Sequence, residues 1–405
     1  MIVSHPTGNQ NVRNAALAFH RANFLERFYT TVAWQGDSRL EKLLPRSILA
    51  TLRRREYGML PKEKISTYPK IEACRLLAII LGINALTRHE TGLCCIDAVY
   101  HNLDNHVARE LAKMMPVKGV YAYEDGALKT FQTAKKMGIK LNYEIASAYW
   151  RAAVTIFREE AELNPEWAVT IGALNYSQDK LNRKDEEIAL ADKIIVASNF
   201  TATNLALGKF LNKSVSIIPY GSPVPVSDIN FVKNNSRKLR VLFVGGLTQG
   251  KGLSYLFGAK HLLKDKISLT VIGRRNRECP PLDRQLDTCR YIPSLPHNEV
   301  LKQMRSHDVL VFPSLWDGFG LVILEAMSQG IPVIASTNTG GPDVITEGED
   351  GYIVPIRSSE AIAEKLELLA NDRELLDRMK NSALETARQY SWERYQAALV
   401  KNVVQ

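Results

Sequence analysis

The chain has 405 residues, of which 45% are hydrophobic and 23% are charged. This is the composition of a folded globular protein of about two domains, and it excludes a disordered chain, a collagen and a small disulfide scaffold. The formal net charge of +9 at pH 7 favours anionic partners, a class that includes nucleic acid, anionic membrane surfaces and phosphorylated small molecules.

The cysteines and the longest apolar run bear on the compartment in which the protein works. The cysteines are odd in number, irregularly spaced and without a C-x-x-C pair: Cys74, Cys94, Cys95, Cys279 and Cys289. This pattern favours a reduced, cytosolic protein. Residues 1–5 read as a strand rather than as a signal peptide. The longest apolar stretch, Ala73 to Leu86, is too short to span a bilayer and is expected to be a buried helix.

The first half of the chain alternates short apolar segments with helical patterns. Expected strands cover residues 1–5, 119–123, 139–143, 193–197 and 215–218. Expected helices cover residues 12–22 and 201–211. The stretch 220–235, which is rich in proline and polar residues, reads as a linker.

The second half repeats this rhythm more clearly. The near-continuous apolar run at 240–244 is its first expected strand, and further strands are expected at 268–272, 291–294, 309–313 and 332–335. Helices are expected at 251–263, 298–305 and 321–328. Short apolar strands that alternate with helices predict an α/β fold in which helices cover both faces of a parallel sheet.

The two halves together predict two doubly wound, Rossmann-like parallel-sheet domains that face each other across a cleft. The first is expected to span residues 1–220 and the second residues 221–389. A last helix at about 390–405 is expected to cross back and pack on the first domain. Ligands of such sheets bind beyond the carboxyl ends of the strands, so both domains would offer those ends to one cleft.

The segment 39–64 is strongly basic. It carries eight lysines and arginines against three glutamates, with leucines and isoleucines between them. It is either a solvated basic face or a patch that rests on an anionic lipid surface or grips a charged acceptor.

The segment from Ser314 to Met327 combines features of an anion-binding site. It follows an expected strand and opens an expected helix, and Asp317 is placed to cap that helix. The free amides from about Phe319 to Val322 would lie at the positive end of the helix dipole. Glu325 follows Leu321 by four residues and therefore projects from the same face, where its carboxylate can accept from two ribose hydroxyls.

A second strand-to-helix loop runs from Phe243 to Gly252. It is neither a P-loop, because Gly252 stands where Ser or Thr would follow Lys251, nor a G-x-G-x-x-G loop. Lys251 can place a positive charge on a diphosphate.

These segments resemble glycosyltransferase family 4, the retaining glycosyltransferases of GT-B fold. The resemblance rests on Asp317-Gly318-Phe319-Gly320 through Glu325, which looks like the E-x7-E region of that family. It extends to five further segments of the chain: 191–198, 218–221, 244–252, 335–355 and 390–394. It covers residues 190–395 well and the first half only loosely.

The resemblance implies a role for each matching residue. Lys251 and Gly246 would lie at the donor diphosphate, and Glu325 would hold the ribose. Asp317 would be catalytic, and it would position the transferred sugar together with the amides of Gly318, Phe319, Gly320 and Leu321. Gly8 and Asn9 would form the first-domain loop near the reaction centre, where His5 is a candidate for acceptor contact or for packing at the strand end.

Three departures from the family pattern matter. Asp317 replaces the usual glutamate, so its carboxylate reaches less far. Gly246 stands where many members carry arginine, which leaves Lys251 as the clearer phosphate cation. The usual catalytic histidine of the first domain is missing, and Glu144 falls near its place by rough register as a second catalytic candidate.

The resemblance implies an enzyme, a hexosyltransferase that moves a sugar from a nucleotide-diphosphate donor to an unknown hydroxyl acceptor with retention. No D-x-D sequence occurs, so no metal or other cofactor is expected. Two alternatives are a non-catalytic nucleotide-sugar or polyanion-binding protein of GT-B fold and a sugar-nucleotide epimerase. The absence of a recognition module argues against nucleic acid. The expected location is cytoplasmic, peripheral at the inner membrane face through residues 39–64.

Overall fold

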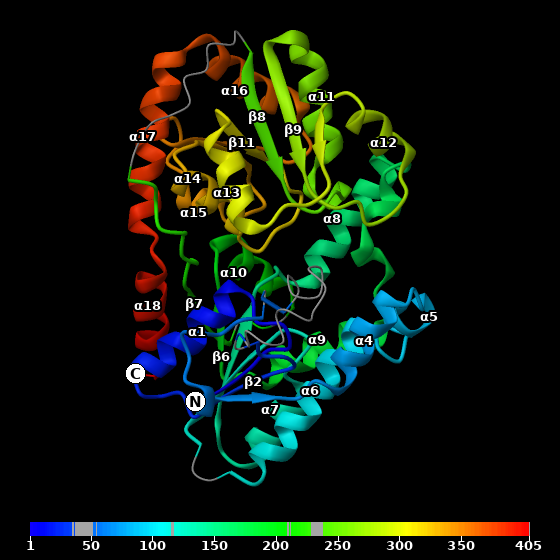
Figure 1. The fold of residues 1–405 in the computed structure, drawn as a ribbon, viewed down its shortest axis with the longest axis vertical. Coiled ribbons are helices and arrows are strands. Elements are labelled where there is room, and N and C mark those ends of the chain that lie inside the picture. The colour runs from blue at the N-terminus through cyan, green and yellow to red at the C-terminus, as the bar shows by residue number, and fades with distance from the viewer. Residues whose placement is uncertain are drawn as a thin grey trace.

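The computed structural model describes residues 1–34, 36, 52–53, 55–114, 117–208, 210, 212–227 and 238–404, and the strands of these ranges form two parallel sheets (Figure 1). The strands are β1 (Ile2–Ser4), β2 (Arg27–Thr30), β3 (Ile65–Thr67), β4 (Gly119–Tyr123), β5 (Lys140–Ile145), β6 (Lys193–Val196), β7 (Ser214–Ile217), β8 (Leu239–Val244), β9 (Ile267–Ile272), β10 (Arg290–Ile292), β11 (Val309–Phe312), β12 (Val333–Ser336) and β13 (Gly351–Val354).

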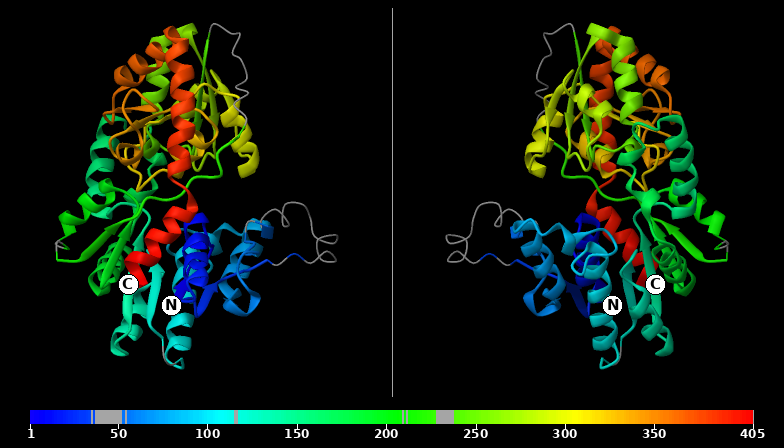
Figure 2. Two further views of the ribbon diagram at one scale, coloured as in Figure 1. Left: turned by 90° about the vertical axis from the view of Figure 1, so that its left-hand side faces the viewer. Right: turned by 90° about the vertical axis from the view of Figure 1, so that its right-hand side faces the viewer.

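Helices cover both faces of each sheet (Figures 1 and 2). They are α1 (Gln10–Arg21), α4 (Lys70–Ile80), α5 (Asn84–Thr87), α6 (Ile96–Leu111), α7 (Leu128–Lys136), α8 (Trp150–Leu163), α9 (Gln178–Leu190), α10 (Asn199–Leu205), α11 (Leu253–Leu263), α12 (Pro280–Leu286), α13 (His297–Arg305), α14 (Leu321–Ser328), α15 (Gly341–Val344), α16 (Ser359–Asn371), α17 (Arg373–Gln389) and α18 (Trp392–Val404).

The strand orders identify two doubly wound sheets. The order is β3-β2-β1-β4-β5-β6-β7 in the first and β10-β9-β8-β11-β12-β13 in the second. Neighbouring strands are parallel, with Val3 opposite Tyr121 in the first sheet and Leu242 opposite Leu310 in the second. These four side chains are fully buried, as expected for strands covered on both faces. The predicted α/β class with two Rossmann-like domains is confirmed.

The chain returns from the second domain to the first between its last two helices. α17 lies along the second domain, whereas α18 runs beside α1 of the first domain (Figures 1 and 2). Gln396 of α18 donates to Asn14 Oδ1 and accepts from Arg21 Nη1, both at 2.8 Å. Tyr390 caps the end of α17. The chain also passes from β7 toward the second domain through residues 218–227, called the crossing segment, in which the Ser222 amide donates to the Tyr390 carbonyl at 2.6 Å. The two domains are therefore joined by two connections that lie side by side: the segment after β7 and the link between α17 and α18.

The apolar stretch from Ala73 to Leu86 is not the buried helix that the sequence predicts. It forms most of α4 and the turn into α5, where Leu77 is 59% and Leu81 is 68% exposed. The buried side of α4 is organised around the carboxylate of Glu72, which accepts from Arg55 and Arg75. The apolar end of the helix is left at the surface. Among the described helices, none is both long and apolar enough to cross a membrane.

The prediction for residues 39–64 falls largely on residues 39–51 and 54, which lie outside the described ranges. One of its described members is not a surface charge. Arg55 is 7% exposed and pairs with the fully buried Glu72. Arg55 therefore holds α4 in place and does not contribute to a basic face.

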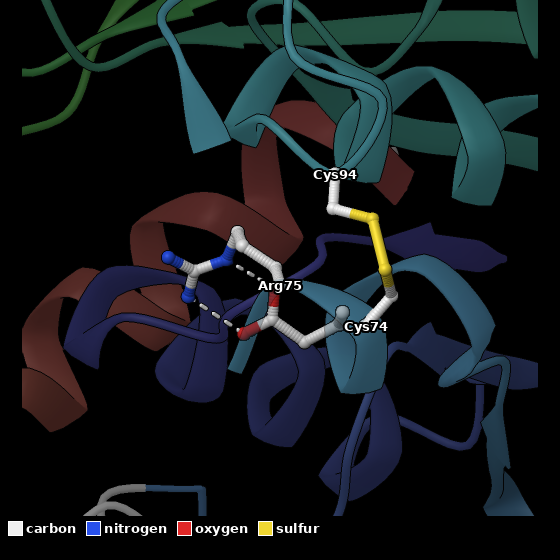
Figure 3. The surroundings of a disulfide bond; sticks show 4 residues. Cys74, Arg75 and Cys94 are labelled. Carbon is white, nitrogen blue, oxygen red and sulfur yellow. Dashed lines mark hydrogen bonds and ion pairs between the residues drawn. A yellow bond between two sulfur atoms is a disulfide. The ribbon is translucent and has the colours of Figure 1, made fainter. Parts of the chain in front are cut away.

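Two cysteines are paired. Cys74 of α4 and Cys94, which precedes α6, form a disulfide bond (Figure 3). The expectation of reduced cysteines is therefore wrong for these two. Their separation of 20 residues carries no signature in the sequence, because the pairing depends on how α4 packs beside the start of α6.

Candidate active site

A cleft of about 340 Å³ opens between the carboxyl ends of the two sheets. The first domain contributes Asn9 and Asn11, which follow β1, and Ala146, which follows β5. The crossing segment contributes Tyr220. The second domain contributes residues that end or follow β8 and β11 and residues that open α14: Val244, Gly245, Lys251, Phe312, Asp317, Phe319, Gly320, Leu321 and Val322.

A charged pair lies in this cleft. The Lys251 ammonium pairs with the Asp317 carboxylate, and their side chains are 26% and 21% exposed. The ammonium also lies 5.4 Å from the centre of the Phe312 ring. The structure thus brings together the two charged residues that the sequence assigned to donor phosphate and transferred sugar, although they are 66 positions apart.

The backbone around Lys251 is fixed by one glycine. Lys251 ends a 3₁₀ turn, Gln249–Lys251, and Gly252 follows with φ +70°. A Cβ at Gly252 would lie 2.0 Å from the Pro313 carbonyl oxygen. Only glycine allows both this left-handed conformation and this close approach to the end of β11. The Lys251 ammonium is therefore held at the carboxyl ends of the strands of the second sheet.

The sequence predicts Asp317 as the N-cap of α14, and this prediction is wrong. The N-cap is Gly320, with φ +84° and no side-chain hydrogen bond. Asp317 instead turns back within its own loop and accepts from the Phe319 amide at 3.1 Å. The amide of Phe319 is therefore already used. The amides of Leu321 and Val322 belong to the first turn of α14, where a helix has no internal acceptor for them.

Gly318 and Phe319 join the two domains. Ser198 Oγ and Thr201 Oγ1 donate to the Gly318 carbonyl at 2.5 and 3.0 Å. A Cβ at Gly318 would lie 2.1 Å from the Ala146 carbonyl oxygen. Phe319 is buried and packs edge-on against Tyr220 at 5.3 Å between ring centres. This loop is thus seated on the first domain, with Gly318 behind the cleft wall.

Glu325 lies on α14 and pairs with a histidine that the sequence analysis did not single out. His297 Nε2, at the start of α13, is 2.9 Å from Glu325 Oε1. This hydrogen bond raises the pKa of His297 above its ordinary value. Glu325 is not among the residues that line the cleft, and its side chain is 15% exposed. The hydrogen bond to His297 holds its carboxylate in one orientation. A histidine at the start of an expected helix gives no signal of this contact in the sequence.

We expect Glu325→Gln to lower the pKa of His297 toward that of an unperturbed histidine, because the amide no longer favours the imidazolium. A histidine whose pKa is raised in the folded state stabilises the fold below its unfolded pKa, and this contribution is lost as the pH rises through the folded value. An NMR titration of the His297 ring protons measures the change. Glu299→Gln, an exposed carboxylate on the same helix, is the control and should leave the titration unmoved. An unchanged His297 titration in Glu325→Gln would contradict the pairing.

Gly8 shapes the first-domain loop without lining the cleft. Its φ is +62°, and a Cβ there would lie 1.9 Å from the Tyr57 hydroxyl. The amides of Thr7 and Gly8 donate to His5 Nδ1 at 3.1 and 2.9 Å. Burial lowers the pKa of His5 to about 3, so His5 stays neutral and accepts these bonds. His5 organises the loop, and Asn9 at its end reaches the cleft.

Glu144 does not line the cleft but lies behind two residues that do, Asn11 and Tyr220. Its side chain is 1% exposed, and it accepts from four donors: Asn11 Nδ2 at 2.8 Å, Tyr121 Oη at 2.5 Å, Tyr220 Oη at 2.7 Å and Tyr395 Oη at 3.3 Å. These donors belong to α1, β4, the crossing segment and α18. The structure therefore does not bring Glu144 together with Asp317, and it makes Glu144 the centre of a buried network.

Gly246 also stays outside the cleft. It is exposed, and the nearest atom to a Cβ there would be Asn276 Nδ2 at 4.0 Å. Its neighbours Val244 and Gly245 line the cleft instead. Val244 is the last residue of β8 and Gly245 follows it, which is the position that the rule on carboxyl ends of strands would have indicated.

A larger hollow of about 760 Å³ lies at the opposite edge of the second sheet. It is lined by residues at the amino ends of β8, β9 and β10. Its cations are engaged with neighbours, for example Lys238 with Asp265 and Arg240 with Asp308. Because ligands of parallel sheets bind at the carboxyl ends, the cleft around Lys251 is the stronger candidate.

Comparison with known proteins identifies the second domain. Residues 227–386 match the family model described as Glycosyl transferases group 1. Sequence relatives include a D-inositol 3-phosphate glycosyltransferase of Corynebacterium glutamicum (39% identity over 25% of each chain) and the sulfoquinovosyl transferase SQD2 of Arabidopsis thaliana (36% identity over 52% of this chain and 44% of the relative). The chain thus spans between a quarter and less than half of the length of these relatives.

Solved structures match over the whole chain. Anabaena HepE in complex with UDP and glucose has a TM-score of 0.65 at 14% identity, over 100% of this chain and 98% of the other. Sucrose-phosphate synthase from Thermosynechococcus elongatus has a TM-score of 0.64 at 17% identity, over 100% and 98%. At these identities the likeness shows the fold alone, and it confirms the GT-B fold. Residues 227–386 of this chain thus match the Glycosyl transferases group 1 family, and the chain as a whole has the two-domain GT-B fold.

Proposed function

We propose that the chain is a glycosyltransferase that moves a sugar, most simply a hexose, from a nucleotide-diphosphate donor to a hydroxyl acceptor. The observation that carries the proposal is the cleft in which Lys251, Asp317 and the first amides of α14 face Asn9 and Asn11 of the other domain. The names of the relatives and the UDP bound by HepE support a nucleotide sugar as donor.

The proposed chemistry divides between the two domains. The bond between the anomeric carbon and the diphosphate oxygen breaks, and the acceptor oxygen bonds to that carbon. Lys251 and the amides of Leu321 and Val322 stabilise the charge on the leaving diphosphate by preorganised electrostatics, without a metal. Under the proposed retention, the acceptor attacks from the leaving-group face, and a diphosphate oxygen takes its proton.

Asp317 has a positioning role in this scheme. In the unliganded protein its carboxylate holds the Lys251 ammonium and, through the Phe319 amide, its own loop. An arriving diphosphate competes for the same ammonium, and Asp317 can then accept from a hydroxyl of the sugar. The Glu325 carboxylate of α14, oriented by His297 of α13, is proposed to accept from the ribose hydroxyls.

We further propose that the protein works in the cytoplasm and that the basic segment 39–64 contacts the inner face of the membrane.

A donor panel tests the proposal. Incubation with UDP-, GDP- and ADP-sugars and with soluble or lipid acceptors, followed by mass spectrometry, is expected to give one acceptor product heavier by a hexosyl group. Asp317→Ala is expected to lower turnover at least tenfold, about 1.4 kcal/mol, because it releases Lys251 and the loop. The control is Asp283→Ala, an aspartate on α12 that pairs with Arg275. Donor turnover that is equal in both variants would exclude this site.

A further inference from the structure

The end of α4 is an exposed apolar tip, defined here as residues 77–83. Its five large apolar side chains are all exposed: Leu77 by 59%, Ile79 by 53%, Ile80 by 60%, Leu81 by 68% and Ile83 by 43%. Single exposed leucines are ordinary on protein surfaces, but a contiguous group of this kind marks a site of interaction. The transfer chemistry proposed above makes no use of it.

The tip is apolar on more than one side. Successive helical residues differ by about 100° around the axis, so Ile79, Ile80 and Leu81 point in three directions. Ile83 follows Gly82, which turns the chain with φ +68°. A rigid protein surface would cover one of these directions and leave the others in water. A fluid medium can cover them all. The tip stands at the edge of the first domain (Figure 1).

The charges around the tip favour an anionic medium. No Asp or Glu occurs between Ala73 and His89. Arg75, within this stretch, shares the buried Glu72 with Arg55, so these three groups keep one net positive charge. Arg88, which follows α5, is exposed, and Lys70, also exposed, lies at the other end of α4. Apolar side chains flanked by cations are the arrangement that binds at the interface of anionic lipid.

The tip is held in shape by the chain around it. The Cys74–Cys94 disulfide joins α4 to the segment before α6 (Figure 3). The Cys94 amide donates to the Leu86 carbonyl at 2.8 Å, and the Ile83 amide donates to Ala78 at 2.8 Å. Leu93, next to Cys94, is 78% exposed. Because the tip is already ordered, binding loses little conformational entropy.

We propose that the apolar tip inserts into the interface of an anionic lipid bilayer and docks the first domain on it. The tip is too short to span the bilayer, so its side chains reach only the boundary between headgroups and acyl chains. This docking is separate from the proposed transfer, since it uses no residue of the cleft.

The test is sedimentation of the full chain with vesicles, at equal protein concentration. Vesicles of equimolar phosphatidylglycerol and phosphatidylcholine are compared with vesicles of phosphatidylcholine alone. The wild type is expected to bind the anionic vesicles more tightly. Leu81→Asp is expected to bind them at least about tenfold more weakly, because it removes a large apolar contact and adds a repelled charge. Leu262→Asp, a 53% exposed leucine on α11 of the second domain, is expected to bind like the wild type.

Several outcomes would overturn the proposal. Equal binding by Leu81→Asp and the wild type would remove the tip as the docking element. Equal binding of the wild type to both vesicles would remove the anionic partner. Light scattering that showed a wild-type dimer and a Leu81→Asp monomer, without vesicle binding, would assign the tip to self-association. Circular dichroism verifies folding, and Ile80→Gln replaces Leu81→Asp if that variant is unfolded. Vesicle binding is measured without donor, so a failed transfer assay leaves this result intact.

Discussion

Replacing Lys251 with alanine is expected to lower kcat/KM for the nucleotide-sugar donor by about 10²- to 10³-fold, the usual effect of removing one preorganised group that stabilises a developing negative charge. The charge that Lys251 meets is largest when the diphosphate has left the sugar. The loss should therefore appear in kcat as well as in KM.

The structure explains why this ammonium is effective. Its side chain is about three-quarters buried, with an exposed fraction of 26%, and Gly252 fixes the backbone beside it at the end of β11. A charge held in a partly desolvated cleft needs little reorganisation when the leaving group forms. In the unliganded protein the charge is already matched by Asp317, so the lysine does not stand unpaired between turnovers.

Steady-state kinetics with the donor found by the panel provides the measurement. Lys260→Ala is the matched control, because Lys260 lies on α11 of the same domain and donates to Thr288 far from the cleft lining. It should change kcat/KM less than twofold, within the usual range for surface substitutions. If Lys251→Ala kept the wild-type kcat and KM, the phosphate assignment would be wrong.

The second domain was predictable from sequence because its strands are buried on both faces. Near-continuous apolar runs such as 240–244 mark such strands directly, and the helix 321–328 is found with the predicted bounds. In the first domain β2 and β3 were missed. These strands have four and three residues, which is too short for a period to be read. The family motifs placed Lys251 and Asp317 in one donor site, but the ion pair between them was not predicted.

Other features depend on tertiary packing that leaves no pattern in the chain. The sequence predicts that the apolar tip is buried, because hydrophobicity alone does not show which side of a helix packs against the rest of the protein. The Cys74–Cys94 pair arises from the packing of α4. Glu144 directly follows the expected strand 139–143, which is also the position of a catalytic carboxylate, whereas in the structure it lies within β5. Only its four donors show that both oxygens are engaged inside the protein.

Replacing Glu144 with leucine is expected to lower the free energy of unfolding by about 3–5 kcal/mol, because the buried donors of Asn11, Tyr121, Tyr220 and Tyr395 lose their acceptor. Glu144→Gln keeps the size of the side chain and one acceptor oxygen, so it should lose less. Tyr395→Phe, which removes a single donor from α18, should cost about 1 kcal/mol. Equilibrium unfolding in urea measures these differences, with Glu159→Gln as an exposed control.

The same variants separate a structural role from a catalytic one. The network joins α1 and β4 to both segments that cross between the domains, Tyr220 and Tyr395. A residue that only positions these elements should leave kcat in folded Glu144→Gln within a few-fold of the wild type while stability falls. A catalytic base would give the opposite pattern, with kcat down by about 10²-fold or more and the urea midpoint unchanged. We expect the first pattern, because the carboxylate is 1% exposed and its four partners are protein donors.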